Sequence, residues 1–320
     1  MAAFLHQLLM VCCMFLIVHP VVTINLSAEF TEFYEGAVLR SYNHYADDLA
    51  DQVASFDGFG SMTPWSVLNG PTHKVKRLDS ASRCGAEYDL SAQDGSSISS
   101  IYGSWVVPEL IQRSDGIPDN PPLNWQWIVE WVGVDNIGAD GQPSQDCSLL
   151  EVGVLSLIYG NHESSRQKNT AFWAMFPQQQ VPINMEIRND DSVDVNVTVV
   201  SEKKAAIAID NLSTRYRIEG ELTIGPEERA KWCGRNAAWI VEDTWAPAVN
   251  VQVPGPVPPF ASWILFNFTD VHATTSSGKK LDLNEATLLD TKQSDPDGHN
   301  MLTLCTPVQM DSTTLEFYPY

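Results

Sequence analysis

The sequence predicts an all-β protein built as a sandwich of two antiparallel sheets. From about Ser97 onward, short segments alternate apolar and polar residues with a period of two, and Gly, Pro, Asn and Asp bound them. No long segment with a helical period separates these stretches. Many short strands without intervening helices favour a sandwich over βαβ units.

Three segments show the alternation most clearly. They are NWQWIVEW (124–131), VDVNVTV (193–199) and ILFNF (264–268). Each carries apolar residues at every second position, among them Trp125, Trp127, Val129 and Trp131 in the first segment. Because successive strand residues point to opposite faces, each segment predicts a strand with one buried face.

Composition excludes two classes of partner. Asp and Glu number 40 against 19 Lys and Arg in 320 residues, which gives a net charge of −21. A surface of this sign repels nucleic-acid phosphates and anionic lipid headgroups, so neither is expected as a partner. The carboxyl excess is compatible with work at low pH, where protonation reduces self-repulsion, and equally with a merely soluble acidic surface.

The N-terminus predicts secretion. Residues 8–18 (LLMVCCMFLIV) form an apolar run that suits a signal peptide and is too short to span a bilayer. A short membrane anchor is the alternative, because no Lys or Arg precedes the run. We expect a signal peptide over residues 1–23, no membrane association after its removal, and an extracellular protein.

A prosegment is expected between the signal and the sandwich. Residues 28–56 have apolar spacings of three and four, which predict one or two helices, and residues 57–71 have the composition of a linker. The dibasic pair Lys76-Arg77 is a candidate processing site, with an ordinary surface pair as the alternative. The predicted division is 1–23, 24–77 and a β-sandwich domain over 78–320.

Secretion makes the cysteines candidates for disulfides. Four remain outside the signal: Cys84, Cys147, Cys233 and Cys305. They allow two disulfides in three connectivities. The sequence has no CxxC pair with a nearby His cluster, so no metal site is expected.

Four N-x-Ser/Thr sequons begin at Asn25, Asn196, Asn211 and Asn267. We expect glycans at the last three, within the sandwich. Signatures of serine hydrolases, zinc peptidases, phosphate loops and dinucleotide sites are absent, and Asp295-Pro-Asp-Gly298 fits a plain turn better than a calcium loop. No cofactor is expected.

Five segments, in order along residues 101–287, carry a resemblance. They are SWVVP (104–108), WVGVD (131–135), CSLLEVG (147–153), CGRNAAWIVED (233–243) and PFASWILFNFTDV (259–271) followed by LDLNEA (281–286). Together they resemble the glutamic peptidases, or eqolisins. The resemblance implies a concanavalin A-like sandwich, an acid endopeptidase without cofactor, and a polypeptide substrate lying extended across one sheet of a monomer.

The resemblance also implies the site residues. Glu242 matches the family glutamate, a general base that acts on water, and Glu151 stands where the family has glutamine, which stabilises the oxyanion. A disulfide between Cys147 and Cys233 would then tie the strand of Glu151 to that of Glu242, and we expect these two strands to lie side by side. Ala174 and Ala238 stand where the family has glutamates.

Trp131 and Asp135 match family positions that line the substrate cleft, with a core Trp and a turn Asp as the alternatives. Because a carboxyl donates only when protonated, Glu151 predicts activity at low pH, below the reference Glu pKa of about 4.3.

Two other functions stay open. One is a catalytically impaired sandwich that binds peptide or glycan, because Glu151 replaces the glutamine. The other is a glycosidase that uses Glu151 and Glu242 as its carboxyl pair. The 91 positions between them disfavour the glycosidase, because sandwich glycosidases often carry both acids on one strand.

Overall fold

The computed structural model describes residues 23–26, 76–80, 82–90, 96–112, 125–135, 147–160, 165–175, 180–224, 230–242, 261–264, 266–294 and 301–319. Strands follow one another through this part of the chain, and its one helix is the single-turn 3-10 helix η1 (Leu283–Glu285). The all-β prediction is confirmed.

One layer, here called the site sheet, is antiparallel across its main strands. Its order is β9 (Val181–Pro182), β8 (Arg166–Met175), β7 (Leu150–Tyr159), β6 (Trp125–Val134), β13 (Asn236–Glu242), β3 (Arg83–Asp89) and β17 (Thr287–Ser294). A further strand, β2 (Lys76–Ser80), pairs in parallel with β17. The strands of Glu151 and Glu242 therefore flank β6, and the expectation that they lie side by side is wrong.

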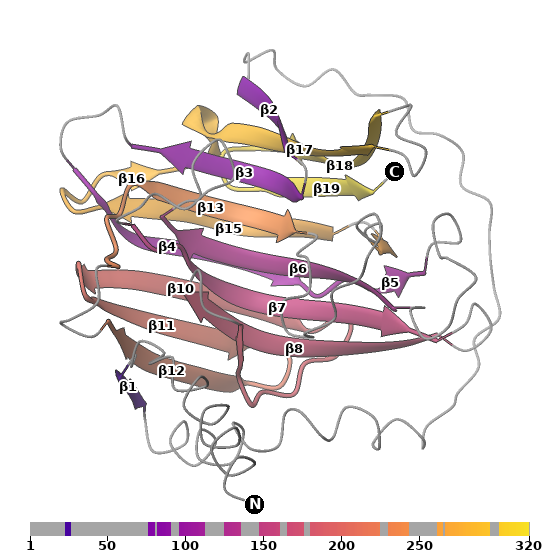
Figure 1. Cartoon of the computed structure of the whole chain (residues 1–320), viewed down its shortest axis with the longest axis horizontal. Coiled ribbons are helices and arrows are strands. Elements are labelled where there is room, and N and C mark those ends of the chain that lie inside the picture. The colour runs from indigo at the N-terminus through magenta and orange to yellow at the C-terminus, as the bar shows by residue number, and fades with distance from the viewer. Residues whose placement is uncertain are drawn as a thin grey trace, which may run out of the picture.

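The second layer, here called the back sheet, lies behind the site sheet. Its order is β19 (Leu315–Pro319), β15 (Phe266–Thr275), β4 (Ile98–Val106), β10 (Ser192–Ser201), β11 (Lys204–Asn211), β12 (Tyr216–Thr223) and β1 (Thr23–Leu26). Figure 1 shows β6 and β7 over β10 and β11; β7 packs against both strands, and β6 packs against β10.

The two layers are joined along one side by β18 (Met301–Gln309), which pairs with β17 of the site sheet and β19 of the back sheet. Short β16 (Lys280–Leu281) pairs antiparallel with the end of β15, and β5 (Leu110–Ile111) pairs with β14 (Ser262–Trp263) as a separate ladder. The result is a sandwich of antiparallel sheets, as the alternation predicts.

The main core fills the space between the layers. Ile128 and Val132 of β6 face it from the site sheet, and Val193 and Val195 of β10 face it from the back sheet. Trp239 of β13 reaches across and donates its indole N–H to the Tyr102 carbonyl at 2.8 Å. Complete burial of one such valine or isoleucine side chain stabilises the folded state by about 2 kcal/mol.

Strand β6 is buried on both faces, although the sequence predicted one buried face. Val129 and Trp131 point away from the main core and are nevertheless 0% exposed. A second apolar cluster covers them on the outer face of the site sheet. Its members are Val129, Trp131, Leu149, Phe172, Ala174, Ala238, Ile240 and Leu289.

Two disulfides close the fold. Cys147–Cys233 joins the segments that lead into β7 and β13, which confirms the pairing implied by the resemblance. Cys84–Cys305 links β3 to β18. This selects one of the three connectivities that the four cysteines allowed.

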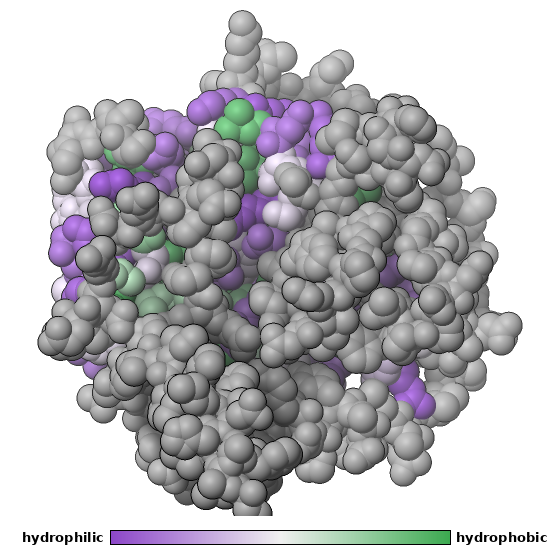
Figure 2. Space-filling model, viewed as in Figure 1, coloured by the Kyte–Doolittle hydropathy of each residue, from purple (hydrophilic) through white to green (hydrophobic). Residues whose placement is uncertain are grey.

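The dibasic pair lies in a strand. Lys76 and Arg77 open β2, where Arg77 forms an ion pair with Asp290 at 2.7 Å. Their side chains are exposed, as a processing site requires, but the segment is not a linker; processing there stays a prediction. In Figure 2, hydrophilic atoms gather at the upper edge, where Figure 1 places β2. Charged side chains on an edge strand oppose pairing with other chains.

One expected strand residue lies outside its strand, and three expected segments lie outside the described residues. Ile264 lies in a bend and is 51% exposed, because β15 begins only at Phe266. The apolar run at 8–18, the helices expected over 28–56 and the turn at 295–298 lie outside the described residues. No helix of the described part is long and apolar enough to cross a membrane.

Candidate active site

Glu242 is the last residue of β13 and is buried. It lies opposite Arg83 on β3 and Val129 on β6. Trp131 donates its indole N–H to Oε2 at 2.9 Å, and Arg83 Nε approaches Oε1 at 3.4 Å. Donors on both oxygens, one of them a cation, suit an ionised carboxylate.

Glu151 points to the same face of the site sheet as Glu242. It lies opposite Gly133 on β6, and Gly133 lies opposite Ala238 on β13. Residues directly opposite each other in a ladder share a face, and Ala238 and Glu242 are four residues apart on one strand. The two carboxyls therefore lie diagonally across β6 on one surface.

The pKa of Glu151 is raised to about 8. Burial is the main cause, repulsion by Glu242 raises it further, and the positive charge of Arg83 lowers it. At acid pH Glu151 is therefore protonated and can donate a hydrogen bond. The arrangement holds a proton donor and a carboxylate close enough to influence each other.

The indole of Trp131 lies between the two carboxyls. A Cβ at Gly133, next to Glu151, would lie only 2.8 Å from the Trp131 ring. At Gly153, opposite Trp131, a Cβ would lie 2.0 Å from the Glu130 carbonyl oxygen. The two glycines of the WVGVD and CSLLEVG segments thus leave the space that the ring and the strand pair require.

Arg83 is a site residue that the sequence analysis missed. Its guanidinium carbon lies 5.4 Å from the centroid of the Trp131 ring, and the side chain is largely buried beside Glu242. A buried arginine needs a charged partner, and Glu242 is that partner here. Its adjacency to Cys84 was the only local signal, and it did not indicate a partner 159 residues away.

Asp135 holds a turn together. It is 1% exposed, has a positive φ of 66°, and accepts hydrogen bonds from the backbone N–H groups of Cys233 at 2.6 Å and Arg235 at 2.7 Å. Burial raises its pKa, and these hydrogen bonds oppose the shift. The placement fits the turn interpretation and gives no support to substrate binding.

The two alanines that replace family glutamates lie beside the carboxyls. Ala174 is opposite Glu151, and Ala238 is opposite Gly133. Both belong to the outer apolar cluster with Trp131. Methyl groups at these positions add no charge, and Glu87 of β3, opposite Ala238, is a further acidic side chain on this face.

The predicted glycosylation positions differ in exposure. Asn196 is exposed, Asn267 is half-buried, and Asn211 is 0% exposed. The described residues contain no group of three or more His, Cys, Asp or Glu side chains placed to hold a metal ion.

Comparison with known proteins identifies the family. The model of the Peptidase A4 family matches residues 81–317, well over half of the chain. A search of curated proteins found no match.

Two solved structures share the fold. Scytalido-glutamic peptidase with a peptide-based transition state analog aligns with a TM-score of 0.56 and 20% identity, over 75% of this chain and 98% of that one. SCP-B, a member of the eqolisin family in complex with the tripeptide Ala-Ile-His, aligns with a TM-score of 0.54, the same identity and the same coverage. The chain therefore belongs to the Peptidase A4 family, as its five sequence segments predicted.

Proposed function

We propose that this chain is a secreted endopeptidase that hydrolyses peptide bonds with water activated by Glu242 while Glu151 carries a proton. Family membership supports a peptidase function. The observation that carries the chemistry is the placement of both carboxyls on one face, with Trp131 between them and Arg83 beside Glu242.

Glu242 acts as the general base. Its carboxylate takes a proton from water as the water oxygen attacks the substrate carbonyl carbon. Arg83 and the Trp131 N–H hold the carboxylate in one orientation. General-base catalysis by a positioned carboxylate contributes about 10²–10⁴-fold to the rate.

Glu151 supplies the donor that the family glutamine supplies. As the carbonyl oxygen gains negative charge, the protonated carboxyl donates a hydrogen bond to it. When the tetrahedral intermediate collapses, Glu242 passes its proton to the leaving amine nitrogen and the C–N bond breaks. Glu151 keeps its proton at the end of the cycle, and Glu242 returns as the carboxylate.

The raised pKa of Glu151 changes the expected pH range. The sequence alone predicted activity below about 4.3, the reference pKa of a glutamate. A pKa of about 8 keeps Glu151 protonated through the acid range and toward neutrality. We therefore propose that activity falls on the alkaline side as Glu151 ionises, because the donor is lost and a second negative charge faces the base.

An extended polypeptide is the proposed substrate. The related SCP-B binds a tripeptide, and the related scytalido-glutamic peptidase binds a peptide-based analog. Two disulfides agree with an oxidising compartment, which supports the proposal of an extracellular enzyme. We also propose that it acts as a monomer.

The test is digestion of a denatured protein by the purified secreted chain between pH 2 and 9. Glu242→Gln is expected to lose at least about 10²-fold in kcat/KM. Glu130→Gln is the matched control, because Glu130 is also a buried carboxyl and lies on the opposite face of the same sheet. Unchanged cleavage by Glu242→Gln would overturn the proposal.

The alternative is an impaired sandwich that binds peptides without cleaving them. The replacement of two family glutamates by Ala174 and Ala238, directly beside the carboxyls, favours it. Peptide binding by the natural chain with no cleavage at any pH from 2 to 9 would support this alternative.

A further inference from the structure

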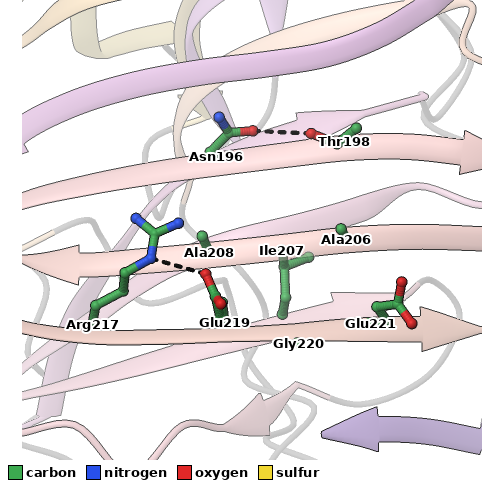
Figure 3. A pocket seen from close by; sticks show the side chains of 9 residues that line it. All are labelled: Asn196, Thr198, Ala206, Ile207, Ala208, Arg217, Glu219, Gly220 and Glu221. Atoms are coloured by element: carbon green, nitrogen blue, oxygen red, sulfur yellow. Dashed lines mark hydrogen bonds and ion pairs between the residues drawn. The ribbon is translucent and has the colours of Figure 1, made fainter. Parts of the chain in front are cut away.

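The outer face of the back sheet carries a trough that the proposed catalysis does not use. It has a volume of about 450 Å³ and runs across β10, β11 and β12 (Figure 3). Its lining is Asn196, Thr198, Ala206, Ile207, Ala208, Arg217, Glu219, Gly220 and Glu221. It lies on the side of the sandwich opposite Glu151 and Glu242.

The register of the three strands explains the shape of the trough. Asn196 lies opposite Ala208, which in turn lies opposite Glu219. Two residues further along, on the same face, Thr198, Ala206 and Glu221 form the same kind of row. The floor therefore consists of alanine methyl groups. The Asn–Thr side and the Arg–Glu side form walls that carry hydrogen-bonding groups, as Figure 3 shows.

Asn196 opens the sequon Asn196-Val-Thr198 at the rim of this trough. Its side chain is exposed, and Thr198 Oγ1 donates to its Oδ1 at 3.3 Å. This contact uses the amide oxygen, whereas an N-linked sugar is attached to the amide nitrogen. The attachment atom thus lies on an exposed side chain beside open space.

Asn211 is unsuited to a glycan in the folded chain. Its Nδ2 donates to the Glu186 carbonyl oxygen at 3.0 Å and to Asp191 Oδ2 at 2.7 Å. A sugar on Nδ2 would remove one of these hydrogens and needs space that a residue with 0% exposure lacks. The half-buried Asn267, whose Oδ1 is buried without a hydrogen-bond partner in the described part, offers less room than Asn196.

We propose that Asn196 carries an N-linked glycan and that the trough seats its first sugars. The C–H face of an N-acetylhexosamine packs on the methyl groups of Ala206 and Ala208, and its hydroxyl groups reach Arg217 and Glu219. The amide nitrogen of Asn196 forms a bond to sugar C1, while the C1–O bond to a lipid-diphosphate donor breaks. The lipid diphosphate leaves with the amide proton.

This inference rests on the proposed secretion, because only a chain that enters the secretory pathway meets that donor. The full chain is expressed in a secreting eukaryotic host, and its intact mass is compared before and after enzymatic removal of N-glycans. Thr198→Ala, which destroys the sequon but keeps Asn196, is expected to lose one glycan. Thr198→Ser, which preserves the sequon, is expected to keep it.

Three results overturn the attachment. The first is a secreted wild type that differs from Thr198→Ala only by the mass of the substitution, which would leave the catalytic proposal unaffected. A glycan lost only when Ser213, the third residue of the Asn211 sequon, is changed to Ala does the same. A wild type retained inside the cell without any glycan overturns both this inference and the proposed secretion.

The proposed position of the first sugars in the trough is tested by enlarging a side chain at its base. Ala208→Leu places a larger side chain where the sugar packs and leaves the sequon intact. The expected result is a several-fold faster enzymatic release of the glycan from the native variant than from native wild type, with equal rates after denaturation. Equal release rates from the two native proteins would show that the glycan does not occupy the trough.

Discussion

The indole N–H of Trp131 on β6 donates to Glu242 Oε2 on β13 at 2.9 Å. The same ring covers Gly133, the residue opposite Glu151. One side chain thus contacts the proposed base and lies beside the strand position of the proposed donor. Because the indole is completely buried, packing fixes its position, and its hydrogen bond in turn fixes the position of the Glu242 carboxylate.

Trp131→Phe is expected to lower kcat/KM by about 10–100-fold, the effect of losing one hydrogen bond to a charged group. Phe is smaller than the fully buried indole, so the melting temperature should also fall, and activity is compared per folded molecule. The check is steady-state kinetics on a peptide substrate together with thermal unfolding.

The matched control for that variant is Trp239→Phe, which removes an indole N–H donated to a backbone carbonyl in the main core. It should lower stability and leave the activity per folded molecule unchanged. Equal activity losses in the two variants would argue that Trp131 acts only through packing.

Arg83→Gln is expected to raise the pKa of Glu151 above its present value of about 8, because the Arg83 charge lowers it. The alkaline limb of the pH–rate profile should therefore move to higher pH, while kcat falls because Glu242 loses its cationic partner. The measurement is kcat/KM against pH.

A control for the charge effect is Arg188→Gln, since Arg188 pairs with Glu186 on the exposed surface. This variant should reproduce the wild-type profile. If the Arg83→Gln profile also overlays that of the wild type, the charge of Arg83 does not affect the pKa of Glu151.

Stability should decrease as pH rises. The pKa of Glu151 is raised to about 8 in the folded chain by burial and by Glu242, against about 4.3 unfolded. A raised folded pKa gives stability that is complete below about 4.3 and is lost as pH rises through about 8. Thermal unfolding from pH 4 to 9 should show a falling melting temperature.

Two variants separate the groups responsible. Glu151→Gln should flatten part of this decline, because the side chain no longer ionises. Glu130→Gln should flatten a further part, since burial also raises the pKa of Glu130 and its hydrogen bonds from Ser156 and the backbone only oppose that shift. A rising melting temperature in wild type would contradict the assignment for both groups.

The two disulfides are expected to have different effects on activity. Replacing Cys147 and Cys233 by serine frees the segments that lead into the strands of Glu151 and Glu242, so kcat/KM should fall at least about tenfold in the folded protein. Replacing Cys84 and Cys305 should mainly cost stability, about 2–5 kcal/mol. Kinetics below the melting temperature of each variant distinguish the two effects.

Local pattern predicted much of the sheet structure. The alternation in VDVNVTV predicted β10, and its three core valines are buried as expected. The same reasoning failed for β6, because alternation shows which residues share a face but not what covers it. Phe172 and Ile240 cover Trp131, and they come from strands that are distant in the sequence.

Pairing between distant segments could not be predicted from local signals. No rule places Arg83 opposite Glu242, inserts β6 between β7 and β13, or selects Cys84–Cys305 from three connectivities. These features depend on the order of strands in the sheets. The family resemblance predicted the Cys147–Cys233 disulfide and the positions of the two carboxyls, whereas Arg83 beside them was found only in the structure.

The most direct test of the proposed mechanism is the pH dependence of kcat/KM for the natural chain beside Glu151→Gln. If protonated Glu151 is the oxyanion donor, the natural chain loses activity as pH approaches about 8, and Glu151→Gln keeps its activity through that range. An alkaline limb at the same pH in both proteins would contradict the role of Glu151.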